Sequence, residues 1–155
     1  MPGLMEQSAR GQVIEVRDGM VVFNPAGTRY QMHLVAGKYA GPLHQPISAI
    51  VRVTARKVYT VPSGGNFIAP IFGQPRTLQG RVVSVDDRVM VIHAGLPVVV
   101  DLPSAETAID LDNGQITVGS MVNVVALPQA RFSTTEPGRG GPEELATDPV
   151  RKTMS

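Results

Sequence analysis

Short runs in which apolar and polar residues alternate recur through the first 135 residues of the chain. In YQMHL, residues 30–34, the apolar side chains alternate with Gln31 and His33. A period of two places successive side chains on opposite faces of an extended strand. The same alternation recurs at residues 51–55, 98–102 and 122–126. The chain is therefore predicted to be all-β and built from many short strands.

Local signals mark where these strands turn and bend. Ile14 and Val16 are expected to face the interior of the first strand, with Glu15 on the opposite face. Asp18-Gly19 predicts a tight hairpin. Further on, the alternation slips at Lys57, which predicts a bulge or a sharp bend before a short fifth strand.

The strand pattern occurs twice along the chain. Gly11 aligns with Gly80, and the Ala-Gly turn that follows the second strand is present in both copies. Small differences in length occur at the turns, where surface loops tolerate them. Internal similarity of this kind indicates a duplicated structural unit. The matched stretches are residues 11–35 with 80–103 and residues 50–55 with 121–126.

Each copy has three strands in a meander, a longer connection, and two further strands. This is the order of an OB-type barrel, although an SH3-like barrel could carry it as well. We therefore expect two tandem five-stranded OB-like or SH3-like barrels, packed through an apolar joint. The expected boundaries are residues 10–61 for the first barrel, 62–78 for the joint, 79–135 for the second barrel and 136–155 for a disordered tail.

One stretch carries a resemblance to known small barrels. ITVGSMVNVVALPQARF, residues 116–132, resembles the closing strands of OB-like and TOBE-type bacterial barrels, in which a glycine turn precedes a valine-rich strand. The resemblance covers most of both halves and implies a fold, but it transfers no site residue. By fold-level analogy it also implies small-anion binding as a weaker functional alternative.

The segment PSGGNFIAPIFGQPR, residues 62–76, lies between the two copies. It lacks the lysine and the following helix that a phosphate-binding loop requires. Its large apolar side chains are costly to leave in water, at roughly 1.5–3 kcal/mol each. We therefore expect them to pack against both barrels and form the inter-barrel joint. These side chains are Phe67, Ile68, Ile71 and Phe72.

Candidate chemistry is sparse. The chain has no cysteine, which excludes disulfides, thiol catalysis and zinc–thiolate sites. His33, His44 and His93 lack the close spacing of a metal site, and DLDNG at residues 110–114 is interpreted as a turn rather than a calcium loop. No serine or threonine lies in a nucleophile elbow. We expect no catalytic residue, metal or cofactor, and therefore no enzymatic activity.

Charge and aromatic content favour one functional class over another. The net charge is only +1 and aromatic residues make up 5% of the chain, so long-range attraction to nucleic acid is weak. The favoured function is a non-enzymatic binding or assembly module that acts through protein–protein surfaces, with another protein or a second copy as partner. The alternative is single-stranded nucleic-acid binding through a basic strand face. Its candidate residues are Arg52, Arg56, Lys57, Tyr59, Arg76 and Arg81.

The first ten residues have neither a basic region nor an apolar region of a secretory signal. No apolar run approaches the roughly 20 residues that span a bilayer. We expect a cytoplasmic protein without a membrane partner.

The tail gives the first testable prediction. Residues 136–155 have no hydrophobic period and are rich in glycine, proline and charge, so they are expected to bury little apolar surface. A chain that ends at Glu136 should keep the thermal unfolding midpoint of the full chain. A large fall in that midpoint would show that the tail docks on the fold.

Overall fold

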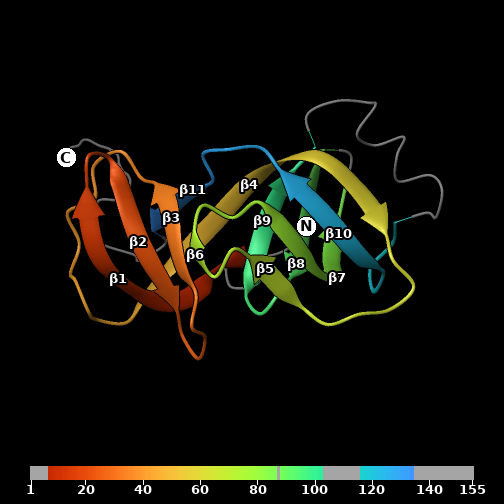
Figure 1. Cartoon of the computed structure of the whole chain (residues 1–155), viewed down its shortest axis with the longest axis horizontal. Coiled ribbons are helices and arrows are strands. Elements are labelled where there is room, and N and C mark those ends of the chain that lie inside the picture. Colours follow the sequence, from red (N-terminus) through yellow and green to blue (C-terminus); the bar gives the residue numbers. More distant parts are fainter. Residues whose placement is uncertain (1–6, 87, 103–115, 135–155) are drawn as a thin grey trace.

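The computed structural model describes residues 7–86, 88–102 and 116–134, which form strands joined by turns and loops (Figure 1). The all-β prediction is confirmed for this part of the chain. The predicted tail and the DLDNG turn lie outside the described residues. The strands are β1 (Ala9–Arg17), β2 (Met20–Pro25), β3 (Gln31–Val35), β4 (Ile47–Thr60), β5 (Phe67–Ala69), β6 (Phe72–Gly73), β7 (Thr77–Val85), β8 (Val89–His93), β9 (Pro97–Asp101), β10 (Met121–Ala126) and β11 (Arg131–Thr134).

These strands form one hydrogen-bonded sheet that closes on itself twice. In the first circuit the order is β1-β2-β3-β11-β4, and β4 pairs again with β1. In the second circuit the order is β4-β10-β7-β8-β9, and β9 pairs again with β4. The short strands β5 and β6 lie outside the circuits and pair with β7 and β3 respectively.

Strand β4 belongs to both circuits and runs from one to the other (Figure 1). Its first residues pair with β1 and β11, its middle pairs with β9, and its last residues pair with β10. Residues 47–60 are thus one continuous strand, where the sequence predicted a fourth strand, a bend and a separate fifth strand. The predicted irregularity is present as a bulge, because the β10 register skips from Lys57 to Ala55.

The two halves of the chain exchange strands. Strand β11 comes from the second half but completes the first circuit, between β3 and β4. The end of β4 comes from the first half but completes the second circuit, beside β10. The prediction of two separate tandem barrels is therefore not confirmed. Strand pairing crosses the boundaries expected at residues 10–61 and 79–135.

A bulge also occurs in the first strand of each circuit. In β1 the register with β2 shifts between Val13 and Glu15, and in β7 the register with β8 shifts between Val82 and Ser84. The β1 bulge corrects the predicted facing of this strand. Val13 is buried whereas Val16 is 42% exposed, because the extra residue reverses the alternation.

The first hairpin turn is the one the sequence predicts. Asp18 and Gly19 have φ values of 50° and 80°, and they alone separate β1 from β2. Two consecutive positive φ values give the turn a twist that matches the flanking strands.

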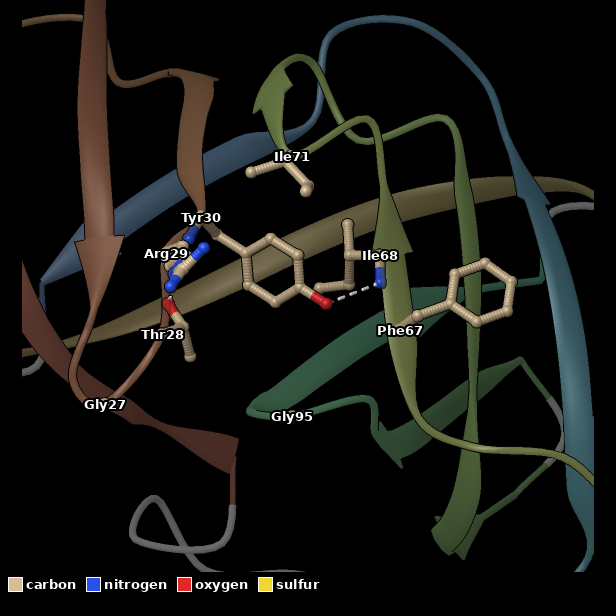
Figure 2. Close-up of a pocket in the computed structure, with 8 residues that line it drawn as sticks. All are labelled: Gly27, Thr28, Arg29, Tyr30, Phe67, Ile68, Ile71 and Gly95. Atoms are coloured by element: carbon tan, nitrogen blue, oxygen red, sulfur yellow. Dashed lines mark hydrogen bonds between the residues drawn. The ribbon is translucent and has the colours of Figure 1, made fainter.

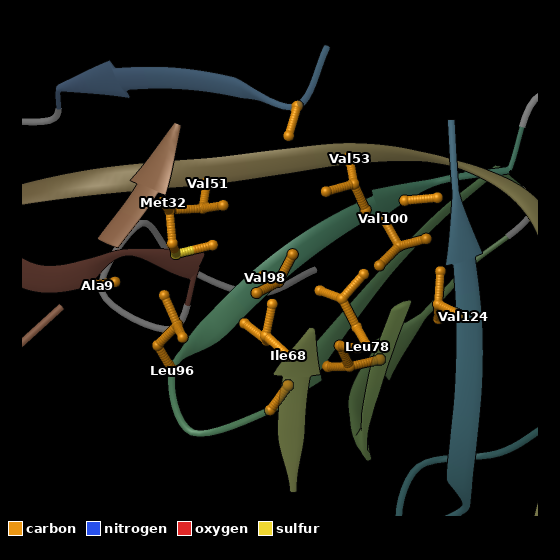
Figure 3. Close-up of a cluster of buried hydrophobic side chains, with 14 of the residues drawn as sticks. Ala9, Met32, Val51, Val53, Ile68, Leu78, Leu96, Val98, Val100 and Val124 are labelled. Carbon is orange, nitrogen blue, oxygen red and sulfur yellow. The ribbon is translucent and has the colours of Figure 1, made fainter. Parts of the chain in front are cut away.

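The interior is a single hydrophobic cluster that contains side chains of both circuits (Figure 3). Val51 and Val53 of β4 lie within it and are fully buried. Met32 contributes from the first circuit, and Leu78 and Val100 contribute from the second. Each buried side chain of this size stabilises the fold by roughly 1.5–3 kcal/mol. Because the cluster is continuous across both circuits, the two circuits share this stabilisation.

The joint contacts both circuits, but it buries less than the sequence predicted. Strand β5 pairs with β7 of the second circuit, and β6 pairs with β3 of the first. Ile68 is buried at 2% exposure, as expected. The expectation of burial is wrong for the other three side chains: Phe67, Ile71 and Phe72 are 38%, 50% and 63% exposed. In so short a segment only one side chain is placed to reach the core.

Gly80 provides a test of the fold. A Cβ atom at Gly80 would overlap the backbone oxygen of His93, whereas a Cβ at Gly65 would meet nothing within 4 Å. We expect Gly80→Ala to lower the free energy of unfolding by about 1–3 kcal/mol, because backbone on the neighbouring strand must move. Gly65→Ala should change it by less than about 0.5 kcal/mol. Urea unfolding measures both, and equal values for the two variants would contradict the close strand approach.

Candidate functional site

A hollow of about 500 Å³ lies beside the joint (Figure 2). One wall is the turn of residues 27–30, which connects β2 to β3. The other walls are Gly95 and the joint residues Phe67, Ile68 and Ile71. The hollow therefore has contributions from the first circuit, the second circuit and the segment between them.

Hydrogen bonds from Asn24 on β2 and from the side chain of Thr28 hold the turn of residues 27–30 in place. The Asn24 amide nitrogen donates to the backbone oxygens of Thr28 and Tyr30, at 3.1 and 2.8 Å. The Thr28 hydroxyl donates to the oxygen of Pro25 at 2.8 Å. Gly27 has a φ of 76°, a conformation that glycine adopts without strain. These contacts fix the backbone from which the Tyr30 side chain projects.

Tyr30 links the turn to the joint. The backbone N–H of Ile68 donates to the Tyr30 hydroxyl oxygen at 2.9 Å, the dashed line in Figure 2. The backbone N–H of Gln31 also donates to the oxygen of Ile71, at 2.9 Å. Tyr30 and Ile68 thus form a fixed floor, while Ile71 and the adjacent Phe72 remain half-exposed or more. No sequence pattern identifies Tyr30 as a site residue, because its hydrogen-bond partner Ile68 is 38 residues away in the chain.

The predicted basic residues separate into two groups. Lys57 and Tyr59 lie on the outward face of the second circuit, and the Lys57 Nζ atom is 5.8 Å from the centre of the Tyr59 ring. Arg81 lies on β7 and donates to the oxygen of Gly119 at 2.9 Å. Arg56 is exposed at the β4 bulge, and Arg76 is exposed where β7 begins. These five residues share the second circuit.

Arg52 does not lie with the other five. It is seven positions before Tyr59 on the same strand, which separates their backbones by about 20 Å. Its guanidinium forms two hydrogen bonds with the Asp101 carboxylate, at 2.9 and 3.0 Å. Arg131 donates to the same carboxylate at 2.6 Å. Arg52 is therefore committed to an ion-pair cluster that joins β4, β9 and β11.

The electrostatics of this cluster follow from its geometry. Burial raises the pKa of Asp101, but the hydrogen bonds and positive charges of Arg52 and Arg131 together lower that pKa below its usual value. The hydrogen bond to Asp101 raises the pKa of Arg52, against the opposing effect of burial. Because the Arg side chains remain 37% and 51% exposed, solvent screens much of the interaction.

Searches for other features and for relatives do not change this picture. No group of three or more metal-ligating side chains occurs in residues 7–86, 88–102 and 116–134. Within the same residues there is no helix of the length and hydropathy needed to cross a lipid bilayer. No protein-family model matches the chain, and a search of curated proteins returned no match.

The Asp101 cluster generates a pH prediction. Since the folded pKa of Asp101 is depressed, its stabilisation is present above the unfolded pKa of about 3.9 and is lost as the pH falls through the folded pKa. Asp101→Asn should lower the free energy of unfolding by about 1 kcal/mol at pH 7. The difference between the two proteins should narrow below about pH 4, as urea unfolding at several pH values would measure.

The control for this prediction is the exposed ion pair of Arg17 with Glu15 on β1. Glu15→Gln should change the free energy of unfolding by less than about 0.5 kcal/mol at any of these pH values. An Asp101→Asn effect that stayed constant down to pH 3 would contradict the proposed role of the carboxylate charge.

Proposed function

We propose that the chain is a non-enzymatic binding module whose hollow beside the joint receives an apolar segment of another protein. One observation carries the proposal: Ile71, which lines the hollow, is 50% exposed, and the adjacent Phe72 is 63% exposed, although their strand neighbours hold the backbone in place. Large apolar side chains grouped on a surface are typical of sites where a partner docks.

The fixed floor supports this proposal. Tyr30 and Ile68 are joined by a hydrogen bond, and Ile68 is buried in the core. A surface whose side chains are already ordered loses less conformational freedom when a partner binds. An aromatic side chain such as Phe72 also has the large contact area and few rotatable bonds that binding hot spots favour. The partner we propose therefore presents an apolar side chain to the hollow.

We propose further that the architecture arose by duplication of an OB-like unit. In the first unit we count β1, β2, β3, the start of β4 and β11 as strands one to five. In the second unit we count β7, β8, β9, β10 and the later part of β4. Both circuits then have the order one, two, three, five, four, and in each the third strand pairs in parallel with the fifth. The bulges after Val13 and Val82 lie 69 residues apart. Gly27 and Gly95, which align in the sequence, both have positive φ. These features support a repeated unit whose last strands were exchanged.

Small-anion binding, suggested by the TOBE-type resemblance, is a weaker proposal. Two cations that converge on one point would suit a small anion, and Arg52 and Arg131 are arranged in this way. Both already bind the Asp101 carboxylate, however. An anion bound between these arginines would have to displace the Asp101 carboxylate, which side chains of two strands hold in place.

The experiment that tests the apolar hollow compares two substitutions at exposed positions. Ile71→Ser removes a half-exposed side chain that lines the hollow, and Val118→Ser removes an exposed side chain, at 65%, that does not line it. Affinity capture from the native host after nuclease treatment identifies bound proteins, and the purified partner is then titrated against each variant. We expect Ile71→Ser to weaken binding by about 30-fold, as for a truncated hot spot of about 2 kcal/mol.

Both variants should fold, since neither side chain is buried. Light scattering of the purified chain distinguishes a second copy from a different protein as the occupant. If Ile71→Ser and Val118→Ser weakened binding equally, or if neither did, the hollow would not be the docking site.

A further inference from the structure

The near-neutral net charge of the chain conceals an uneven distribution. The net charge of the whole chain is +1, but several basic residues lie on two strands of the second circuit: Arg52, Arg56 and Lys57 on β4, and Arg81 on β7. The total of +1 therefore does not reveal the local positive charge of these strands.

The positive charge has an uninterrupted surface on the second circuit. The adjacent strands β4, β10, β7 and β5 contain no aspartate or glutamate. The four described carboxylates lie elsewhere: Glu15 on β1, Asp18 in the first hairpin turn, Asp86 after β7, and Asp101 on β9. Asp101 binds Arg52 of β4, but Lys57 of β4 and Arg81 of β7 have no described ion pair with a carboxylate.

Two aromatic side chains lie in one cross-strand row of this surface. Tyr59 on β4 pairs with Asn123 on β10, Asn123 pairs with Gln79 on β7, and Gln79 pairs with Phe67 on β5. Tyr59 and Phe67 are 39% and 38% exposed, so both rings are partly open to solvent. Three strand spacings place their backbones about 14 Å apart.

The amides between the rings are held in one orientation. The Gln79 side-chain nitrogen donates to the oxygen of Gly65 at 2.8 Å, and the Gln79 side-chain oxygen accepts from Asn123 at 3.2 Å. The Asn123 Oδ1 atom is buried and has no hydrogen-bond donor within the described residues. An acceptor left in this state costs free energy.

Cations lie in the rows on either side of the aromatic row. Lys57 pairs with Val125 in one neighbouring row, and its Nζ atom lies near the Tyr59 ring. Arg81 pairs with Met121 in the row on the other side. The arrangement combines partly exposed aromatic rings with flanking positive charges, which is how proteins bind unpaired bases and their phosphates together. We call this surface the Tyr59 face, and it comprises Lys57, Tyr59, Phe67, Gln79, Arg81 and Asn123.

We propose that the Tyr59 face binds single-stranded nucleic acid. Stacking on Tyr59 and Phe67 requires bases that are free of a complementary strand, so a duplex should bind less well. An acidic peptide could use the two cations but would gain nothing from the rings. The Tyr59 face shares Phe67 with the apolar hollow, but Tyr59 and Lys57 do not line the hollow, so substitutions of these two residues test the proposal independently of it.

The first experiment titrates the full chain into a fluorescently labelled 20-nucleotide single strand of mixed sequence at several salt concentrations. Each phosphate contact contributes about −0.7 to the slope of log K against log salt for a single strand. Contacts from Lys57 and Arg81 predict a slope of about −1.4, and Lys57→Ala should reduce its magnitude by about 0.7. A labelled duplex of the same sequence should bind more weakly than the single strand.

The second experiment separates stacking from charge. Tyr59→Ala should weaken binding by about tenfold, whereas Tyr59→Phe should retain it, because the phenyl ring still stacks. Lys57→Glu is matched with Lys38→Glu, the same change of charge on the loop after β3 of the first circuit. Lys57→Glu should have the larger effect. Unfolding midpoints confirm that each variant is folded. If Lys57→Glu is not folded, Arg81→Ala takes its place as the variant that removes a cation from the face.

Any of four results would overturn the proposal. The wild-type chain could fail to bind the strand at low salt. Tyr59→Ala could bind as well as the wild type, or Lys38→Glu could weaken binding as much as Lys57→Glu, which would show that only the overall charge matters. Preference for a poly-glutamate peptide over the single strand would assign the face to an acidic protein instead.

Discussion

Pairing of β4 with strands of both circuits is the constraint on which the rest of the structure depends. The strand is 14 residues long, and it contacts β1 and β11 at one end, β9 in the middle and β10 at the other end. Its inward side chains, including Val51 and Val53, lie in a core that the two circuits share. The hollow, the Asp101 cluster and the Tyr59 face are therefore parts of one body, held at fixed distances from one another.

Sequence patterns predicted many of the strands and several turns, because these features depend on residues that are close together in the chain. The alternation in residues 31–35 and the Asp18-Gly19 turn act within a few residues, so period and turn chemistry reveal them. The β1 bulge was missed, because one extra residue reverses the facing of Val16 without a signal in the alternation itself. Pairings across long distances, such as Arg52 with Asp101, leave no local trace at all.

The candidate sites were predicted less well than the fold. The apolar content of the joint indicated burial, but apolar content does not reveal which side chain faces inward, and only Ile68 does. The basic residues were grouped by their proximity in the chain, which joined Arg52 to Lys57 although the strand separates them. Averaging charge over the whole chain obscured the positive strands, because the compensating acidic residues belong to other segments. Gln79 and Asn123 carried no motif and became visible only through strand register.

The exchange of strands has a consequence for how the protein is made. During synthesis the first three strands and the start of β4 emerge early, but their circuit cannot close until residues 131–134 have left the ribosome. Until then β3 and the first part of β4 present unpaired backbone edges of the kind that promote aggregation. Contacts between distant parts of a chain also form slowly, since the ends of a long loop must first meet. The N-terminal half therefore becomes stable only after β11 has been synthesised, and a nascent chain stalled before β11 would be a natural substrate for chaperones.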